Sequence, residues 1–167
     1  DIVLISDRQE NDNVFLSMMG RSVEPIHNFS DIRHVLVKQD YIEDFLPIGK
    51  NTAMVLNEDG GAPSFAYVIG VDFDAYATFF PDNITCVQGR LPVGSGPAIL
   101  VPTGARRQIF ESSGQLYKSK GHPLDTVDIP AEAKANMDRV NIHDEIVFMG
   151  MSDNNASTDI RLDVTGI

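Results

Sequence analysis

Residues 52–71 read TAMVLNEDGGAPSFAYVIGV, and this stretch decides the fold class. Two runs rich in apolar, β-branched and aromatic residues, 52–56 and 65–71, flank the polar segment 57–61. Asp-Gly between two such runs is typical of a β-hairpin, because glycine readily adopts the positive φ that tight turns need. The sequence therefore predicts an antiparallel hairpin at this point of the chain.

Before the hairpin, the sequence predicts a strand and then a helix. Residues 2–5 form a continuous apolar run, which is typical of a strand covered on both faces. A helix is expected over residues 30–39, with Ser30 as its N-cap, because the apolar residues follow the i, i+3, i+4 spacing of one helix face. Pro47 and Gly49 mark a break between this helix and the hairpin.

After the hairpin, short helices and strands alternate. Asp72 and Thr103 are the expected N-caps of two helices, and Ile109 and Phe110 are expected to face the core. The polar segment 115–139 is expected to be the least regular part of the chain. We predict helices over residues 71–80, 103–111 and 131–138, and strands over residues 84–87, 98–101, 145–149 and 160–164. This mixture of helices and antiparallel hairpins predicts an α+β fold.

Length, composition and charge describe a folded, acidic protein. The 167 residues are 43% hydrophobic and 22% charged, which suits one domain or two small lobes. A composition shift near Pro81 suggests an α/β lobe over residues 1–80 and a β-rich lobe over residues 81–167. The formal charge of −11 repels phosphate backbones, so nucleic acid is excluded as a partner and anionic lipid headgroups are disfavoured.

The ends of the sequence suggest a longer parent chain. No apolar stretch reaches the roughly 18–20 residues that span a bilayer, and no signal-peptide pattern opens the sequence. The first residues already have the character of a buried strand, and residues 160–167 alternate like a strand still in progress. Because natural termini are more often polar, we expect that both ends are cut.

Cysteine and histidine supply no recognisable metal or catalytic set. Cys86 is the only cysteine, so neither an intrachain disulfide nor a cysteine zinc cluster can form. Its apolar neighbours indicate a small buried strand residue rather than a reactive thiol. No two histidines have the i, i+4 spacing of a zinc-binding helix. We expect solvated or hydrogen-bonded histidines at His27, His34, His122 and His143.

One polar segment resembles a calcium loop only in part. Its oxygen-bearing side chains alternate, but Thr158 and Val164 stand where an EF-hand has its glycine and its bidentate glutamate. Asn and Asp are also common in hairpin turns, so a polar turn between two strands is the favoured interpretation. The alternating residues are Asp153, Asn155, Ser157 and Asp159.

Two acidic pairs have the residue types of a general acid and base. Asp72 and Asp74 lie two apart at a helix start and are expected to point in different directions. Asp144 and Glu145 are neighbours in a strand and are expected to face opposite sides. The chain contains no nucleophile elbow and no phosphate loop, and the glycines of residues 94–96 precede a strand rather than a helix. The sequence therefore predicts no catalytic, cofactor-binding or metal-binding residue, and no enzyme.

Five segments, taken in order, resemble the periplasmic core domain of ABC-transporter permeases of the MacB, FtsX and LolC type. Each is a strand next to a glycine turn, and the series extends from Tyr67 to Ile167. His143 stands where the family usually has glycine, and the segment 115–139 looks like an insertion. The segments are YVIGVD at 67–72, VQGRLP at 87–92, AILVP at 98–102 with Ala105 and Phe110 after it, NIHDEIVF at 141–148 and DVTGI at 163–167.

The resemblance implies a non-catalytic domain inserted between the first two membrane helices of a permease. Such a domain has an α/β lobe and a β-rich lobe and faces the periplasm or the extracellular side of the cell membrane. It recognises a substrate or partner protein and relays conformational change driven by a cytoplasmic ATPase. The implied partners are the ATP-binding subunit or domain, a second permease, and a periplasmic adaptor or lipoprotein.

Two other function classes stay open. An extracytoplasmic sensor domain for small molecules predicts a concave apolar pocket with a few convergent polar groups. A hydrolase requires Asp72, Asp74 or a histidine to converge in space with other ionisable groups.

Overall fold

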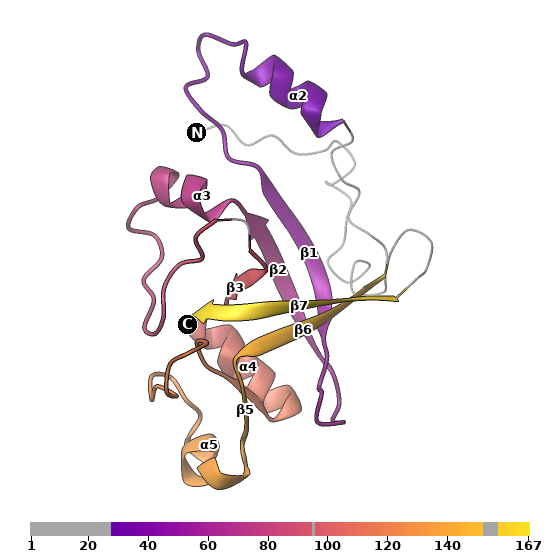
Figure 1. Cartoon of the computed structure of the whole chain (residues 1–167), viewed down its shortest axis with the longest axis vertical. Coiled ribbons are helices and arrows are strands. Elements are labelled where there is room, and N and C mark those ends of the chain that lie inside the picture. The colour runs from indigo at the N-terminus through magenta and orange to yellow at the C-terminus, as the bar shows by residue number, and fades with distance from the viewer. Residues whose placement is uncertain (1–27, 95, 152–156) are drawn as a thin grey trace. The chain divides into compact units, whose positions relative to one another are not determined.

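The computed structural model describes residues 28–94, 96–151 and 157–167, so the strand expected over residues 2–5 lies outside the described residues. The predicted hairpin is confirmed: strands β1 (Ile48–Val55) and β2 (Ser64–Val71) are hydrogen-bonded neighbours at one edge of a sheet (Figure 1). The break predicted at Gly49 is wrong, because this glycine lies inside β1. Proline restricts itself and the residue before it, so a strand can begin directly after Pro47.

The predicted α+β class is also confirmed. The sheet has five strands in the order β2-β1-β6-β7-β3, and it is mostly antiparallel. Strands β6 (Glu145–Met151) and β7 (Ser157–Gly166) form a long antiparallel ladder, and β1 joins β6 through the pairs Met54–Met149 and Val55–Phe148. The short strand β3 (Ala98–Leu100) lies parallel to the C-terminal part of β7.

Four α-helices occur in the described part of the chain, in the regions where the sequence predicts them. They are α2 (Phe29–Leu36), α3 (Phe73–Phe79), α4 (Thr103–Ser113) and α5 (Ala131–Ala135), and a 3-10 turn, Met137–Arg139, follows the last.

Two of the predicted helix caps are wrong. Ser30 lies inside α2, whose N-cap is Asn28 in the left-handed conformation. Thr103 is the first helical residue of α4, because Pro102 occupies the cap position with an extended ψ of 144°. The carbonyl of Pro102 accepts the first helical hydrogen bond from Arg106 at 2.9 Å. The helix positions were thus predicted correctly while their first turns were not, as is usual for sequence-based boundaries.

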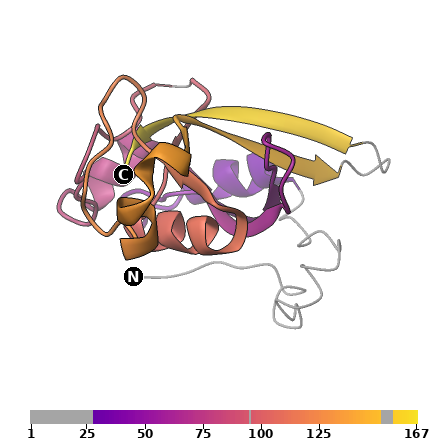
Figure 2. The ribbon, with the colours of Figure 1, turned by 90° about the horizontal axis from the view of Figure 1, so that it is seen from below.

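The segment 115–139 is more regular than the sequence predicts. It begins with strand β4 (Gln115–Tyr117), all three residues of which are buried, and β4 pairs in parallel with β5 (Asn141–His143). Helix α5 lies between these two strands in the chain and packs beside α4 (Figure 2). A small apolar core joins them, made of Leu116, Ile129 and Ala133 with Phe110, Leu124 and Val140 around it.

The strand predicted over residues 84–87 is wrong. This segment has no regular strand, but Val87 and Gln88 form backbone hydrogen bonds with Ile167, the residue after β7. The N–H of Val87 donates to the carbonyl of Ile167 at 2.7 Å, and the N–H of Ile167 donates to the carbonyl of Gln88 at 3.0 Å. Gly89 forms an isolated bridge with Gly166. The apolar run thus supplies an irregular neighbour for the end of β7 rather than a strand.

The chain divides into two compact units. Among the described residues, one unit contains 28–52 and 68–72, and the other contains 53–67, 73–94, 96–151 and 157–167. Strands β1 and β2 contribute residues to both units. The lobes predicted over residues 1–80 and 81–167 stay a prediction. None of the described helices combines the length and the apolar composition needed to cross a bilayer.

Candidate functional site

Three of the four histidines lie in the described part of the chain. His27 lies outside the described residues, and His34 and His122 are exposed. His143 lies on β5 with its Nε2 3.0 Å from Oδ2 of Asp59, in the hairpin turn. The interpretation of His143 as a hydrogen-bonded histidine is therefore confirmed, and its carboxylate partner is a residue that the sequence did not single out.

The two acidic pairs have different outcomes. Asp72 and Asp74 are exposed at the start of α3. The expectation that Asp144 and Glu145 face opposite sides is wrong, because the chain bends at Asp144, between β5 and β6. The alternation of side chains holds only along a continuous strand. Both carboxylates instead line one polar depression of about 210 Å³.

The segment that resembles a calcium loop is partly a strand. Asp153 and Asn155 lie outside the described residues, whereas Asp159 belongs to β7 and pairs with Met149 of β6. The predicted turn therefore ends earlier than expected, before Ser157. No group of His, Cys, Asp and Glu side chains in the described ranges is arranged to hold a metal ion.

Cys86 is half-buried and outside any strand. Its sulfur packs near the backbone of Gly166, where an added Cβ would lie 3.1 Å from Sγ. Burial raises the pKa of the Cys86 thiol. Because the thiolate is the reactive form, this environment disfavours reactivity at neutral pH.

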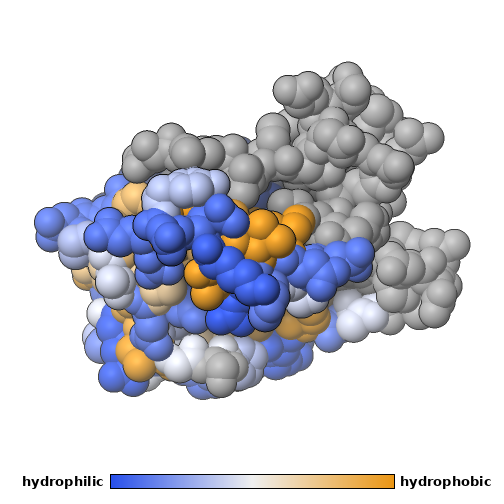
Figure 3. Space-filling view, turned by 90° about the horizontal axis from the view of Figure 1, so that it is seen from above, coloured by the Kyte–Doolittle hydropathy of each residue, from blue (hydrophilic) through white to orange (hydrophobic). Residues whose placement is uncertain are grey.

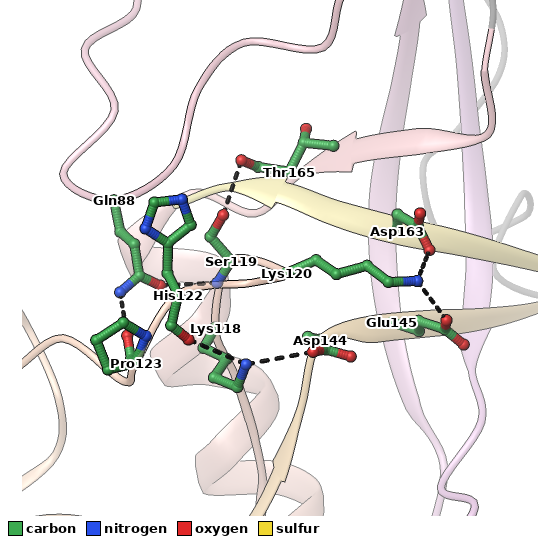
Figure 4. Close-up of polar contacts among 10 residues, drawn as sticks. All are labelled: Gln88, Lys118, Ser119, Lys120, His122, Pro123, Asp144, Glu145, Asp163 and Thr165. Atoms are coloured by element: carbon green, nitrogen blue, oxygen red, sulfur yellow. Dashed lines mark hydrogen bonds and ion pairs between the residues drawn. The ribbon is translucent and has the colours of Figure 1, made fainter.

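A polar junction joins three segments that are far apart in the sequence (Figure 4). We call Gln88, Ser119, Pro123 and Thr165 the Gln88 junction. The carboxamide oxygen of Gln88 accepts a hydrogen bond from the backbone N–H of Ser119 at 2.7 Å, and its NH₂ group donates to the carbonyl of Pro123. The hydroxyl of Ser119, a residue only 1% exposed, donates to the carbonyl of Thr165 at 2.8 Å. We call residues 118–123 loop 118–123. The Gln88 carboxamide attaches this loop to residues 87–90, and the Ser119 hydroxyl attaches it to the end of β7.

Loop 118–123 has a defined turn that matches the spacing of these hydrogen bonds. The backbone N–H of His122 donates to the carbonyl of Ser119 at 3.1 Å, and Gly121 has a φ of +78°. This is the pattern of a type II turn, whose third position needs positive φ and therefore favours glycine. Both groups that Gln88 contacts, on Ser119 and Pro123, are brought within reach of one carboxamide by this turn.

Two lysines of loop 118–123 attach it further to β6, to β7 and to the bend at Asp144 before β6. The ammonium of Lys120 lies 2.6 Å from Asp163 and 2.7 Å from Glu145, and Lys118 lies 3.2 Å from Asp144. The hydrogen bonds to Asp163 and then Glu145 raise the pKa of Lys120 above its ordinary value. The hydrogen bond from Lys120, followed by that from Arg161, lowers the pKa of Glu145.

Arg161 extends this row of charges toward the hairpin turn. Its guanidinium lies 2.5 Å from Glu58 and 3.0 Å from Glu145. The hydrogen bonds to Glu58 and then Glu145 raise the pKa of Arg161. Positive and negative side chains therefore alternate along this surface, and each cation named here has a carboxylate partner.

A second attachment point lies on α4. Arg106 is 0% exposed and contacts Asp125 through both of its terminal nitrogens, at 2.7 and 3.1 Å. One of these nitrogens also donates to the carbonyl of Val127. Burial alone would raise the pKa of Asp125, but the hydrogen bonds from Arg106 and from the N–H of Val127 lower it below its ordinary value.

These contacts attach loop 118–123 to the segments beside it. The polar groups of the Gln88 junction satisfy one another, and the lysines beside it are paired with carboxylates. The face shown in Figure 3 is mostly hydrophilic where residues are described, with separate hydrophobic patches. Neither Gln88 nor Ser119 belongs to a recognisable sequence motif, because their hydrogen-bond partners lie 31 to 46 residues away.

Comparisons of the chain with protein-family models, with curated proteins and with solved structures found no match. The resemblance to permease domains therefore depends on the five sequence segments alone.

Proposed function

We propose that this chain is a non-catalytic, extracytoplasmic domain of an ABC-transporter permease of the MacB, FtsX and LolC type. In this role it recognises a substrate or partner protein and relays conformational change driven by a cytoplasmic ATPase. The ordered series of five segments between Tyr67 and Ile167 is the observation that carries the proposal.

The fold supports this proposal by the way it groups those segments. Residues 87–90 bond to residues 165–167, β3 pairs with β7, and β6 pairs with β7. Four of the five segments therefore meet around the C-terminal part of one strand. A shared structural role explains why segments that are individually unspecific occur together in this order.

The contacts of β7 also suit a relay. Residues 157–163 pair with β6, and Asp163, Val164 and Gly166 pair with β3 on the other side. Beyond the end of β6, the backbone of residues 87–90 forms hydrogen bonds with Thr165 and Ile167. A strand bonded along both edges moves with its neighbours instead of sliding out alone. Under the proposal, the partners are an ATP-binding subunit, a second permease, and an adaptor or lipoprotein, and the domain faces the periplasm or the outside.

A topology experiment on the full-length membrane protein tests this proposal. A protease site inserted between Gly60 and Gly61, in the exposed hairpin turn, is expected to be cut from outside intact spheroplasts. Inside-out vesicles are the matched control, in which the same site is expected to be protected. The cutting rate is also expected to change when the transporter is trapped with ATP and vanadate.

Two results would contradict the proposal. Cutting only in inside-out vesicles would place the domain in the cytoplasm. A full-length protein that does not fractionate with membranes would remove the permease altogether.

The sensor alternative has one specific observation in its favour. A depression of about 480 Å³ lies along α2 and is lined by Phe29, Ser30, Arg33, His34 and Val37. Its volume lies within the range of small-molecule sites, but it is an open groove along one helix and not an enclosed cavity. Stabilisation of the chain by a small molecule, lost in an Arg33→Ala variant, would favour the sensor over the relay.

A further inference from the structure

We propose that loop 118–123, residues 87–90 and residues 163–167, which are the end of β7 and the residue after it, open and close as one cooperative unit, fastened by Gln88 and Ser119. This conformational device goes beyond the proposed function, because it concerns how the chain itself moves and does not depend on a role in transport.

Backbone hydrogen bonds join the loop to strands on two sides. The N–H of Lys120 donates to the carbonyl of Val164 at 2.7 Å, and the N–H of Lys118 donates to that of His143 at 2.9 Å. In addition, Val164 donates to the carbonyl of Asp144 at 2.9 Å. The loop therefore cannot leave without exposing backbone groups of β7, which costs free energy unless water replaces each bond.

The Gln88 junction extends this dependence to residues 87–90. Gln88 contacts the loop at both Ser119 and Pro123, while its own backbone exchanges hydrogen bonds with Ile167. Release of the loop thus breaks both bonds of the Gln88 carboxamide. Loss of the backbone pairing at Ile167 likewise moves that carboxamide away from the loop.

The three segments are closely packed against one another at Gly89. A Cβ added to Gly89 would lie 2.1 Å from the carbonyl oxygen of Thr165 and 2.2 Å from the hydroxyl oxygen of Ser119. One backbone therefore touches both the loop and β7. Because close-packed contacts of this kind have few intermediate arrangements, the three segments are expected to separate together.

Opening of this unit also changes the charges on the surface. In the closed form, Lys120 is shared by Asp163 and Glu145, and Lys118 is paired with Asp144. Opening separates the two lysines from three carboxylates. In the open form, loop 118–123 therefore carries two lysines without their carboxylate partners, and Asp144, Glu145 and Asp163 lose their lysine partners.

Amide hydrogen exchange on the isolated chain, read residue by residue by NMR, tests the cooperative unit. In Ser119→Ala, the amides of Lys120, Val87 and Ile167 are expected to exchange faster by a similar factor, about five- to tenfold. This factor corresponds to one hydrogen bond of about 1–1.4 kcal/mol. The amide of Lys134, in α5, is expected to change by less than about twofold, because its opening is separate.

Ser112→Ala is the matched control, because Ser112 on α4 also donates a hydroxyl hydrogen bond to a carbonyl, that of Ile109, at 3.0 Å. It is expected to leave the amides of Lys120, Val87 and Ile167 unchanged. Gln88→Ala is the second test and is expected to reproduce the pattern of Ser119→Ala. Faster exchange at Lys120 alone, with Val87 and Ile167 unchanged in both variants, would overturn the proposal.

Discussion

Replacing Asp125 by alanine tests how strongly the buried ion pair with Arg106 stabilises the segment after β4. The Arg106 side chain is 0% exposed and that of Asp125 is 12% exposed, and Nε of Arg106 has no hydrogen-bond partner among the described residues. Removing the carboxylate therefore leaves a buried, poorly compensated cation. Changes of this kind cost about 3–5 kcal/mol.

The expected magnitude is measurable for a chain of this size. Domains of roughly 150–250 residues lose about 2–4 °C in Tm per kcal/mol, so Asp125→Ala is expected to lower Tm by about 6–20 °C. Urea unfolding followed by circular dichroism gives the free energy directly. Arg106→Met combined with Asp125→Ala is expected to recover part of the loss, because the double variant leaves no buried charge.

The neighbouring arginine supplies a matched control. Arg107 also pairs with an aspartate, Asp128, but the two side chains are 48% and 30% exposed. Exposed pairs contribute about 0–1 kcal/mol, so Arg107→Ala is expected to lower Tm by less than about 4 °C. Equal losses in Asp125→Ala and Arg107→Ala would refute the reasoning that burial decides the magnitude.

The sign of the pH dependence follows from the lowered pKa of Asp125. The folded state favours the ionised carboxylate, so the pair stabilises the protein above the unfolded pKa of about 4. This stabilisation is lost as the pH falls through the folded pKa, where the carboxylate takes up a proton. The stability difference between the native chain and Asp125→Ala is therefore expected to shrink in acid.

Three further predictions concern single residues. Gly89→Ala is expected to lower the free energy of unfolding by about 2 kcal/mol or more beyond Gly94→Ala, because both glycines have positive φ but only Gly89 would place its Cβ within 4 Å of other atoms; equal losses in urea unfolding would contradict this. Burial, with smaller contributions from nearby carboxylates, raises the pKa of Tyr117 to about 12. The neutral Tyr117 hydroxyl therefore stabilises the folded state below the unfolded pKa of about 10, and this stabilisation is lost between about pH 10 and 12. Tyr117→Phe is expected to remove the part of an absorbance titration that occurs at the highest pH. Cys86 is expected to react slowly with a thiol reagent at pH 7.5 and faster after urea unfolding, since burial raises its pKa; equal rates would count against its burial.

The parts of the fold that the sequence predicts correctly depend on nearby residues. The β1–β2 hairpin follows from an Asp-Gly turn between two apolar runs, and α2 follows from the i, i+3, i+4 spacing of its apolar residues. The β6–β7 pair has the same local character. In each case, the residues that decide the structure lie close together in the sequence, within one helix or within two consecutive strands.

Strand β4 shows why the rest could not be predicted. Gln115–Tyr117 has three residues, too few for a periodic pattern, and its partner β5 begins only at Asn141. Gln115 is 2% exposed because its carboxamide donates to the carbonyl of Leu56 at 3.2 Å, a contact between residues 59 apart. A buried polar residue whose partner is so distant looks like an exposed one in the sequence.

The residues of the Gln88 junction are also far apart in the sequence, by 31 to 46 residues, and the attachment of such segments has a consequence for an acidic protein. The chain has 13 Lys and Arg residues against 24 Asp and Glu residues, so few cations can form the ion pairs that attach one segment to another. Lys120 attaches loop 118–123 from an exposed position, whereas Arg106 attaches the following segment from a buried one. Salt screens exposed pairs far more than buried ones. Rising ionic strength is therefore expected to speed amide exchange in loop 118–123 before it affects α5, although the same salt also relieves repulsion across the whole acidic chain.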